Sequence, residues 1–526
     1  MTGIEKTGIE IAKEGTTETK AVLTKKQAAE AKTVKSAETE TARTEAEAAR
    51  TGTEAARTET EAAKAETART ETKAAKAETA RTKTARTKTE AAEAAKAETA
   101  RTEITESEII GIMKREIVCA LGCTEPSAVA LAVAKARETL GEEPEKILLH
   151  VSGNILKNAM NVGIPGTNLK GIETAAALGS VAGKAEYGLE VLKGVEEDHI
   201  RQAQEMIQQG RLEIQLKDCE EKLYIEAKCI KGDRSAEAVI ERYHTNFVNV
   251  CKNDRVIYFK DKEESAEEIS GTYHLTLERI WEFVQQCGME QLSFLKEVIE
   301  VNSRIAEEGL RGDYGMGVGK HLSERGKREK ETDFQTCVVS YVSAAADARM
   351  AGCALPVMAT TGSGNQGLTA SLPVIAAAGW LKCSEEELYR GLALSELVTI
   401  HVKEYIGKLS ALCGCAIAAS IGSACGITYL LGGQYKNIEY AVKNMVADIS
   451  GLICDGAKAG CALKIATSVS GAIQCAYLAL EGVEAPERDG IVCESVEDTI
   501  CNLGNLGNNG MRVTDHVILD MMLAKE

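Results

Sequence analysis

Residues 1–102 contain no cysteine, no proline and no aromatic side chain, and consist almost entirely of Ala, Thr, Glu, Lys and Arg. Such a segment cannot bury enough apolar surface to offset the entropy that it would lose on folding. The string AAKAETART recurs in it, starting at Ala62, Ala74 and Ala94, but no large apolar residue recurs to form a coiled-coil seam. The sequence therefore predicts a disordered or partly helical tail over residues 1–102, without a catalytic role.

Basic side chains are outnumbered by acidic ones in the rest of the chain. Residues 1–102 hold 20 Lys and Arg against 18 Glu, which leaves 42 basic and 61 acidic side chains after them. A domain this acidic repels phosphate groups and is a poor partner for nucleic acids. We expect it to bind a small molecule instead.

The first fifteen residues, MTGIEKTGIEIAKEG, lack the apolar core of a secretory signal peptide. All 17 cysteines follow residue 118, and their odd number does not suit a disulfide framework. Both observations predict a cytoplasmic protein whose distinctive cysteines serve thiol or metal chemistry.

Two uncharged runs, 350–381 and 409–435, are long enough to cross a bilayer. They are interrupted by Gly, Ser, Thr, Asn and Gln, and they contain few of the Leu, Ile and Phe residues that drive membrane insertion. We therefore predict closely packed helices around a cofactor and no membrane span.

Apolar periodicity predicts the fold class. Helical spacing occurs over 102–122, 127–140 and part of 171–209, and again in most segments after residue 265. Alternating or β-branched segments predict strands over 146–154, 211–218, 222–230, 236–253 and 255–261. The predicted fold is α+β, a mainly helical catalytic domain with a strand-rich lobe. The predicted units are 1–102, 103–262 and 263–526.

Cys123 is the best candidate for a reactive cysteine. It lies in GCTEP, where Thr124 is a plausible N-cap and Pro126 stands just inside the following helix. The positive end of a helix dipole favours a thiolate. From this context alone, a structural cysteine at a tight turn is an equally good interpretation.

The segment TTGSGNQG, residues 360–367, precedes an apolar helical run. Backbone amides and hydroxyl groups at a helix start form a cradle for a carboxylate or a phosphate. No GKS or GKT follows, so the segment is not a Walker loop. Ser363 and Asn365 are the candidates for binding a substrate carboxylate.

Four further cysteines predict a metal centre. Cys454 and Cys461 flank a short DGAK turn, and Cys413 and Cys415 lie about forty residues earlier. Thiolates are soft ligands that suit iron–sulfur clusters. Three ligands on a four-iron cube would leave one iron open, which is typical of a catalytic cluster.

Histidines and lysines supply the remaining candidates for reactive groups. None of the seven histidines forms a paired metal motif, and only His401, close in sequence to the first cysteine pair, is a candidate proton carrier. Lys458 or Lys464 could form a Schiff base with pyridoxal phosphate, but the surrounding cysteines make metal binding the simpler interpretation.

The motifs GCTEPSAVA, ATTGSGNQG, KLSALCGCAIAAS and CDGAKAGCALK together resemble those of the L-cysteine desulfidase family, which is related to the catalytic domain of iron–sulfur L-serine dehydratases. The resemblance covers residues 104–526 and excludes the repetitive tail. It implies an oxygen-sensitive [4Fe-4S] cluster held by Cys454, Cys461 and either Cys413 or Cys415, with Cys123 as the general base. It also implies a homo-oligomer.

By this resemblance the substrate is a small amino acid, and the reaction eliminates sulfide from L-cysteine to give pyruvate and ammonia. The open iron would polarise the Cβ–S bond while Cys123 removes the Cα proton. The nearest competing function is that of an L-serine or L-threonine dehydratase on the same cluster. The sequence is also compatible with a membrane transport protein and with a redox or cluster-storage protein.

Overall fold

The computed structural model describes residues 104–526 except 220, 261–272, 330–331, 408 and 526. Ile104–Glu526 forms one compact unit. The prediction for residues 1–102 lies outside the described residues, and so does the predicted boundary between residues 262 and 263.

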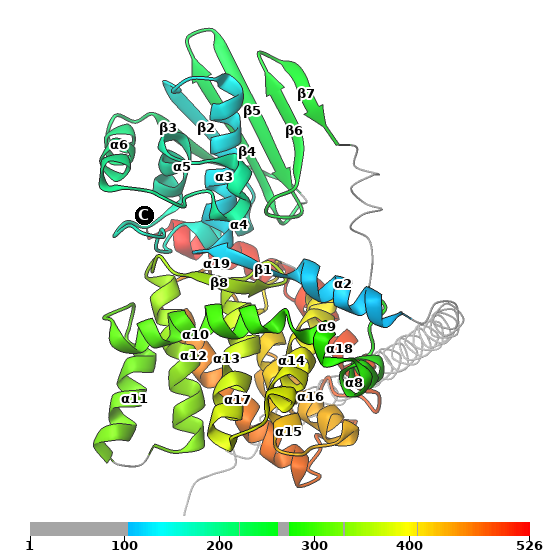
Figure 1. The fold of residues 1–526 in the computed structure, drawn as a ribbon. Helices are drawn as coiled ribbons and strands as arrows, with labels where there is room; N and C mark the ends of the chain where they lie inside the picture. The colour runs from blue at the N-terminus through cyan, green and yellow to red at the C-terminus, as the bar shows by residue number, and fades with distance from the viewer. Residues whose placement is uncertain (1–103, 220, 261–272, 330–331, 408, 526) are drawn as a thin grey trace, which may run out of the picture. The chain divides into compact units, whose positions relative to one another are not determined.

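The strands form two sheets (Figure 1). The larger has the order β3-β2-β4-β5-β6-β7, in which β2 and β3 are parallel and all other neighbours are antiparallel. The smaller pairs β1 with β8. The strands are β1 (Ile117–Leu121), β2 (Lys146–Val151), β3 (Leu212–Leu216), β4 (Tyr224–Lys231), β5 (Arg234–Glu241), β6 (Phe247–Lys252), β7 (Arg255–Phe259) and β8 (Pro356–Thr360).

The helices of the first half are α2 (Glu106–Glu116), α3 (Thr124–Leu140), α4 (Gly153–Ala159), α5 (Ile172–Val181), η1 (Ala185–Glu190), α6 (Glu197–Gln208), α8 (Leu277–Gln286), α9 (Met289–Leu292), α10 (Leu295–Arg311) and α11 (Val318–Glu329). Those of the second half are α12 (Phe334–Met350), α13 (Gly364–Leu381), α14 (Glu385–Ile406), α15 (Ala418–Leu430), α16 (Tyr435–Ile449), α17 (Cys461–Leu480), α18 (Val496–Asn505), η2 (Leu506–Gly510) and α19 (Arg512–Leu523).

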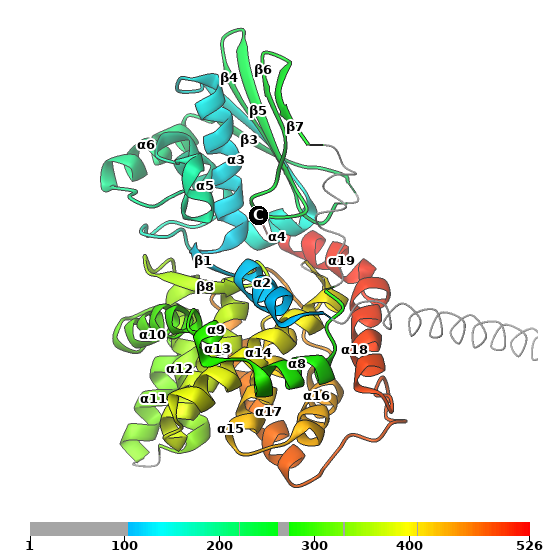
Figure 2. The ribbon, with the colours of Figure 1, turned by 45° about the vertical axis from the view of Figure 1, so that its right-hand side comes forward.

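The α+β prediction is confirmed. Strands β2–β7 with helices α3–α6 form a sheet lobe, and most of the later helices form a helical lobe, as Figures 1 and 2 show. Alternation along β4 buries Ile225, Ala227 and Cys229 on the face that carries α3. The Cys229 thiol reaches the carbonyl of Val133 on α3 at 3.9 Å. The sheet therefore supports α3, and the N-terminal end of α3 is directed toward the helical lobe (Figure 1).

Two boundaries differ from the prediction. The helix expected over 102–122 ends at Glu116, and Ile117–Leu121 becomes β1, which pairs with the distant β8 in register Ile117↔Thr360. An apolar run of this length suits a helix or a strand, so pairing with the distant β8 determines that these residues form a strand. The strand expected over 236–253 is divided into β5 and β6 by a turn in which Arg242 has a φ of 68°.

The uncharged runs do not form spanning helices. Residues 350–381 contain a turn, β8 and then α13, and 409–435 contain only the 13-residue α15. Among the described helices only α17 is long and apolar enough to cross a bilayer. Of its most apolar 18-residue stretch, 44% is buried inside the protein. The small residues allow close packing: a Cβ at Gly422 would lie 2.3 Å from the carbonyl oxygen of Ser395.

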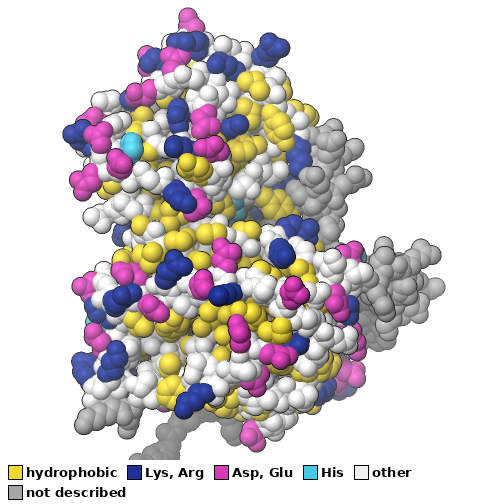
Figure 3. Space-filling model, viewed as in Figure 1, with side chains coloured by type: hydrophobic (Ala, Val, Ile, Leu, Met, Phe, Trp, Pro, Cys, Tyr) yellow, Lys and Arg dark blue, Asp and Glu magenta, His cyan; other side chains and the backbone are white. Residues whose placement is uncertain are grey.

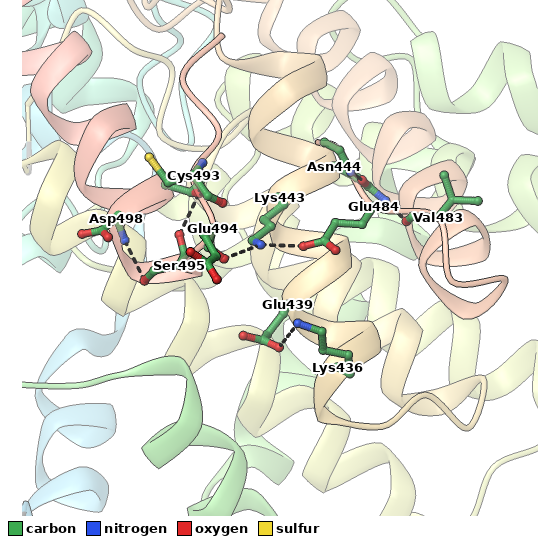
Figure 4. Close-up of polar contacts among 12 residues, drawn as sticks. Lys436, Glu439, Lys443, Asn444, Val483, Glu484, Cys493, Glu494, Ser495 and Asp498 are labelled. Carbon is green, nitrogen blue, oxygen red and sulfur yellow. Dashed lines mark hydrogen bonds and ion pairs between the residues drawn. The ribbon is translucent and has the colours of Figure 1, made fainter. Parts of the chain in front are cut away.

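Polar side chains of α16 hold the segment that follows α17 (Figure 4). The buried Lys443 Nζ contacts the Glu484 carboxylate at 2.5 Å and donates to the carbonyl of Glu494 at 2.6 Å. Asn444 donates to the carbonyl of Val483 at 2.9 Å. These contacts of Lys443 and Asn444 fix this part of the helical lobe, and neither residue lines the pocket described next.

On the surface, charges of both signs are scattered, and hydrophobic side chains gather over the β6–β7 edge (Figure 3).

Candidate functional site

A pocket of about 90 Å³ brings together the five candidate cysteines and the two candidate carboxylate-binding residues that the sequence predicts. Its wall includes Cys123, Ser363, Asn365, Cys413, Cys415, Cys454 and Cys461. These residues come from the start of α3, the start of α13, the loop before α15 and the turn before α17. The pocket thus gathers segments separated by more than three hundred residues. The roles of the residues stay predictions.

Two chain segments present the metal-binding candidates side by side. Leu412 and Ile453 form an isolated antiparallel bridge. The amide of Cys413 donates to Leu452 at 2.9 Å, and that of Cys454 donates to Ala411 at 2.7 Å. Because side chains alternate along extended segments, those of Cys413 and Cys454 lie on the same side of the bridge. Cys415 lies in the turn beyond it, with its Sγ 3.5 Å from that of Cys413.

The DGAK turn is closed by ion pairs. The Asp455 carboxylate contacts both Lys458 Nζ and Lys464 Nζ, and Lys464 also donates to the carbonyl of Ile453 at 2.7 Å. Burial alone would raise the pKa of Asp455, but the two lysines lower it to about 2. Both candidate Schiff-base amines are therefore engaged in holding the turn that precedes Cys461.

Two glycines allow the close approach of the walls. Gly456 has a φ of 89°, and a Cβ there would lie 2.4 Å from the carbonyl oxygen of Lys157. A Cβ at Gly414 would lie 2.5 Å from Gln366 Oε1 and 3.1 Å from Lys403 Nζ. Gly456 is therefore required by the close approach of the Lys157 backbone, and Gly414 leaves room for the side chains of Gln366 and Lys403.

Cys123 lies at the N-cap of α3, one residue before the predicted cap Thr124, and its side chain makes no capping hydrogen bond. It is 2% exposed, and burial raises the pKa of its thiol to about 11, against the opposing charge of Arg349. The expectation that the helix dipole favours a thiolate is therefore corrected, since desolvation outweighs it in this pocket. Arg349 is the neighbour whose charge favours ionisation of the Cys123 thiol.

The predicted carboxylate cradle is only partly available. Ser363 is the N-cap of α13 and makes no side-chain capping bond, so its hydroxyl is not used there. Asn365 Oδ1 accepts a hydrogen bond from Arg349 Nη1 at 3.0 Å. Gln366 Oε1 is buried without a partner among the described residues. Asn365 therefore serves to hold Arg349, and Gln366 is a pocket residue that the sequence analysis missed.

A carboxylate next to Cys123 was also missed. Glu125 Oε1 accepts a hydrogen bond from Asn158 Nδ2 at 3.1 Å and lies 3.9 Å from His244 Nε2. Burial alone would raise the pKa of Glu125, but His244, with help from the Thr124 hydroxyl, lowers it to about 2. The GCTEP motif signals Glu125, and Asn158 begins a Gly- and Asn-rich segment, whereas no local pattern signals His244.

The predicted proton carrier lies elsewhere. His401 is fully buried on α14, and its Nε2 lies 2.8 Å from Glu497 Oε2. It is absent from the pocket wall, whereas His244 reaches Glu125 there. Proximity in sequence to the cysteine pair was a poor guide, because the helix carries His401 away from the turn.

The donor set is chemically suited to an iron–sulfur cluster, because four of the cysteine thiols on the wall are soft ligands. No three His, Cys, Asp or Glu side chains of the described residues converge on one point closely enough to hold one metal ion. Each cysteine of a four-iron cluster binds a different iron, so its sulfurs surround the cluster at separate corners. Hydrogen bonding from Cys415 lowers the pKa of Cys413 to about 6, while burial and Cys413 raise that of Cys461 to about 12. Metal binding would release the remaining thiol protons.

Comparison with known proteins places the chain in a family. A family model described as serine dehydratase alpha chain matches residues 186–520. The chain is 47% identical over 428 residues to a UPF0597 protein of Bacteroides fragilis, covering 81% of this chain and 99% of that protein. A UPF0597 protein of Clostridium perfringens is 43% identical over 416 residues, covering 79% and 97%.

The match confirms the relation to the catalytic domain of iron–sulfur serine dehydratases that the motifs indicated. It makes the chain a serine dehydratase-like lyase, and the family is one associated with an iron–sulfur cluster. The chain belongs to the serine dehydratase alpha-chain family.

Proposed function

We propose that the protein eliminates sulfide from L-cysteine, without pyridoxal phosphate, and that Cys454, Cys461 and Cys413 hold a [4Fe-4S] cluster for this reaction. The observation that carries the proposal is the single pocket in which four cysteines from two hydrogen-bonded segments face a fifth at a helix start. The GCTEP and CDGAK motifs favour cysteine as the substrate by their resemblance to desulfidases.

The choice of Cys413 over Cys415 rests on the bridge between Leu412 and Ile453. The side chains of Cys413 and Cys454 lie on one side of this bridge, while Cys415 continues into the turn. When bound, the cluster would supply a Lewis-acidic iron that assists departure of the substrate's leaving group. Three protein ligands are consistent with that role because they leave one iron open.

The chain's own residues supply the proton chemistry. Cys123 takes the Cα proton in its thiolate form, which is the minor form near neutral pH because burial raises its pKa to about 11, and the Cβ–S electron pair leaves with sulfide. The aminoacrylate that forms becomes an imine, which water hydrolyses to pyruvate and ammonia. Arg349 favours the ionised form of Cys123, and the buried wall keeps bulk water from the reacting carbon.

A second candidate is the dehydration of L-serine or L-threonine. It is favoured by the family match, whose description names serine dehydratase. Anaerobically reconstituted protein incubated with each of L-cysteine, L-serine and L-threonine separates the two. Sulfide and pyruvate from L-cysteine support the desulfidase, whereas a 2-oxo acid from a hydroxy amino acid with no sulfide from L-cysteine supports the dehydratase.

A pair of cysteine variants tests the assigned base. Cys123→Ala should keep its iron and lose turnover, because the thiol is assigned to proton removal and not to metal binding. Cys119→Ala provides a matched control, since Cys119 is an exposed cysteine on β1 that does not line the pocket. Loss of iron in Cys123→Ala would make Cys123 a ligand instead.

A further inference from the structure

Arg349 is a buried cation without a carboxylate partner among the described residues. It lies in the last turn of α12 and is 3% exposed. Its Nη1 donates to Asn365 Oδ1 at 3.0 Å, its Nη2 donates to the carbonyl of Gly122 at 2.8 Å, and its Nε has no hydrogen-bond partner. Two other buried cations have carboxylate partners: Lys157 meets Asp515, and Lys443 meets Glu484. A buried charge is costly unless an opposite charge compensates it.

The surroundings of Arg349 are built to hold the guanidinium in place. A Cβ at Gly364 would lie 2.3 Å from Arg349 Nε and 2.6 Å from its Cζ, so only glycine leaves room for the guanidinium at that position. The two acceptors, Gly122 and Asn365, belong to the segments that begin α3 and α13. Arg349 is thus fixed between two helix starts.

This position attracts an anion. Arg349, Cys123 and Asn365 all line the pocket. The N-terminal ends of α3 and α13 add their partial positive charges to that of the guanidinium. The nearby carboxylate of Glu125 is already engaged with Asn158, the Thr124 hydroxyl and His244. The cation is therefore available to a ligand.

We propose that Arg349 binds the α-carboxylate of the amino-acid substrate and thereby presents the Cα–H bond to Cys123. The assignment rests on the proposed function and extends it. Charge-assisted hydrogen bonds from a planar guanidinium match a carboxylate in geometry and charge. Pairing with Arg349 also offsets the carboxylate charge, which otherwise opposes removal of the adjacent proton. Asn365 positions Arg349, in place of the direct carboxylate contact expected from the sequence.

Neutral isosteric ligands test the assignment. Cluster-loaded wild-type protein is given L-cysteine or L-cysteinamide, and sulfide release is measured. Binding of the unreactive pair L-alanine and L-alaninamide is measured separately by calorimetry. We expect the wild type to prefer each acid over its amide by about a hundredfold or more, since a buried charge pair is lost with the amide.

Arg349→Gln should remove this preference, mainly by lowering kcat/KM for the acid, and Arg349→Lys should keep part of it. Arg137→Gln is the matched control. Arg137 donates to a backbone carbonyl, that of Gly183, at 2.5 Å and also has an unpartnered Nε, but it is absent from the pocket wall. It should leave the acid preference unchanged.

The outcomes separate the two proposals. Wild-type protein that releases sulfide from L-cysteine but treats acid and amide alike overturns the role of Arg349 and leaves the proposed function standing. The same follows from an Arg349→Gln variant that keeps the preference. L-Alanine binding that depends on Arg349, without turnover of L-cysteine, overturns the desulfidase and supports the carboxylate site. Because equal treatment of acid and amide by the wild type overturns the role of Arg349 without any variant, misfolding of a variant does not remove the test.

Discussion

The ammonium group of Lys157 lies 3.1 Å from the carbonyl oxygen of Cys454, to which it donates a hydrogen bond across 297 residues of chain. The same Nζ pairs with Asp515 on the C-terminal helix α19 at 2.7 Å. Lys157 is almost completely buried, so this three-way contact joins α4, the CDGAK turn and α19. The cysteine turn is thus held by both a sheet-lobe helix and the end of the chain.

Lys157→Met should destabilise the protein by about 3–5 kcal/mol, because it leaves Asp515 without its buried partner. It should also lower the iron content after anaerobic reconstitution, since Cys454 loses its anchor. Urea unfolding and iron analysis measure both effects. Lys146→Met, which breaks the exposed pair with Glu213, should change neither appreciably. An unchanged iron content in Lys157→Met would show that the turn is held without this contact.

Replacing single cysteines should identify the ligands. Cys454→Ser, Cys461→Ser and Cys413→Ser are each expected to lose most of the iron and the visible absorption of the reconstituted protein, whereas Cys415→Ser should retain them. Cys475→Ser is the control, since Cys475 is buried on the same helix as Cys461 but does not line the pocket. The opposite result for Cys413 and Cys415 would reverse the choice made from the Leu412–Ile453 bridge.

Gly414→Ala should disturb the turn between Cys413 and Cys415. The added methyl group would lie 2.5 Å from Gln366 Oε1, so the buried Gln366 side chain must shift, at a cost of roughly 1–3 kcal/mol. Thermal unfolding and iron content report the effect. Gly379→Ala on the exposed side of α13 meets no atom within 4 Å and should stabilise the helix by about 0.5–1 kcal/mol. Equal effects of the two substitutions would contradict the close approach at Gly414.

Glu396 should make stability fall between mildly acidic and neutral pH. It is fully buried, with one hydrogen bond, from the Thr360 hydroxyl, at 2.8 Å, and burial raises its pKa from 4.5 to about 8. The folded chain then binds the proton more tightly than the unfolded chain, so folding weakens as pH rises from about 4.5 to about 8. The loss by pH 7 is on the order of 3 kcal/mol.

Glu396→Gln removes this titration, so its stability relative to the wild type should increase from pH 5 to pH 8 in urea unfolding. Glu385→Gln, an exposed change on the same helix, should leave the pH dependence as in the wild type. A parallel pH profile for wild type and Glu396→Gln would mean that Glu396 is ionised in the folded protein.

Most of the elements could be predicted from local sequence. Period-2 alternation indicated β4, and helical spacing indicated α3 and α13, because each element buries one face whose spacing is visible in the sequence. The strand β1 was missed because Ile117–Leu121 continues an apolar helical pattern without a break. Its conformation depends on β8, which is more than two hundred residues away and has no strong signal of its own.

The sequence by itself determined which side chains are candidates for the chemistry, since residue type and motif mark the five cysteines in GCTEP, CGC and CDGAKAGC. Only the tertiary structure decided that they share one pocket, that Cys413 is aligned with Cys454, and that Arg349 stands beside Cys123 without a carboxylate partner among the described residues. The reason is physical, since a thiol's chemistry belongs to the residue, whereas burial, charge pairing and alignment arise from segments that are distant in the chain.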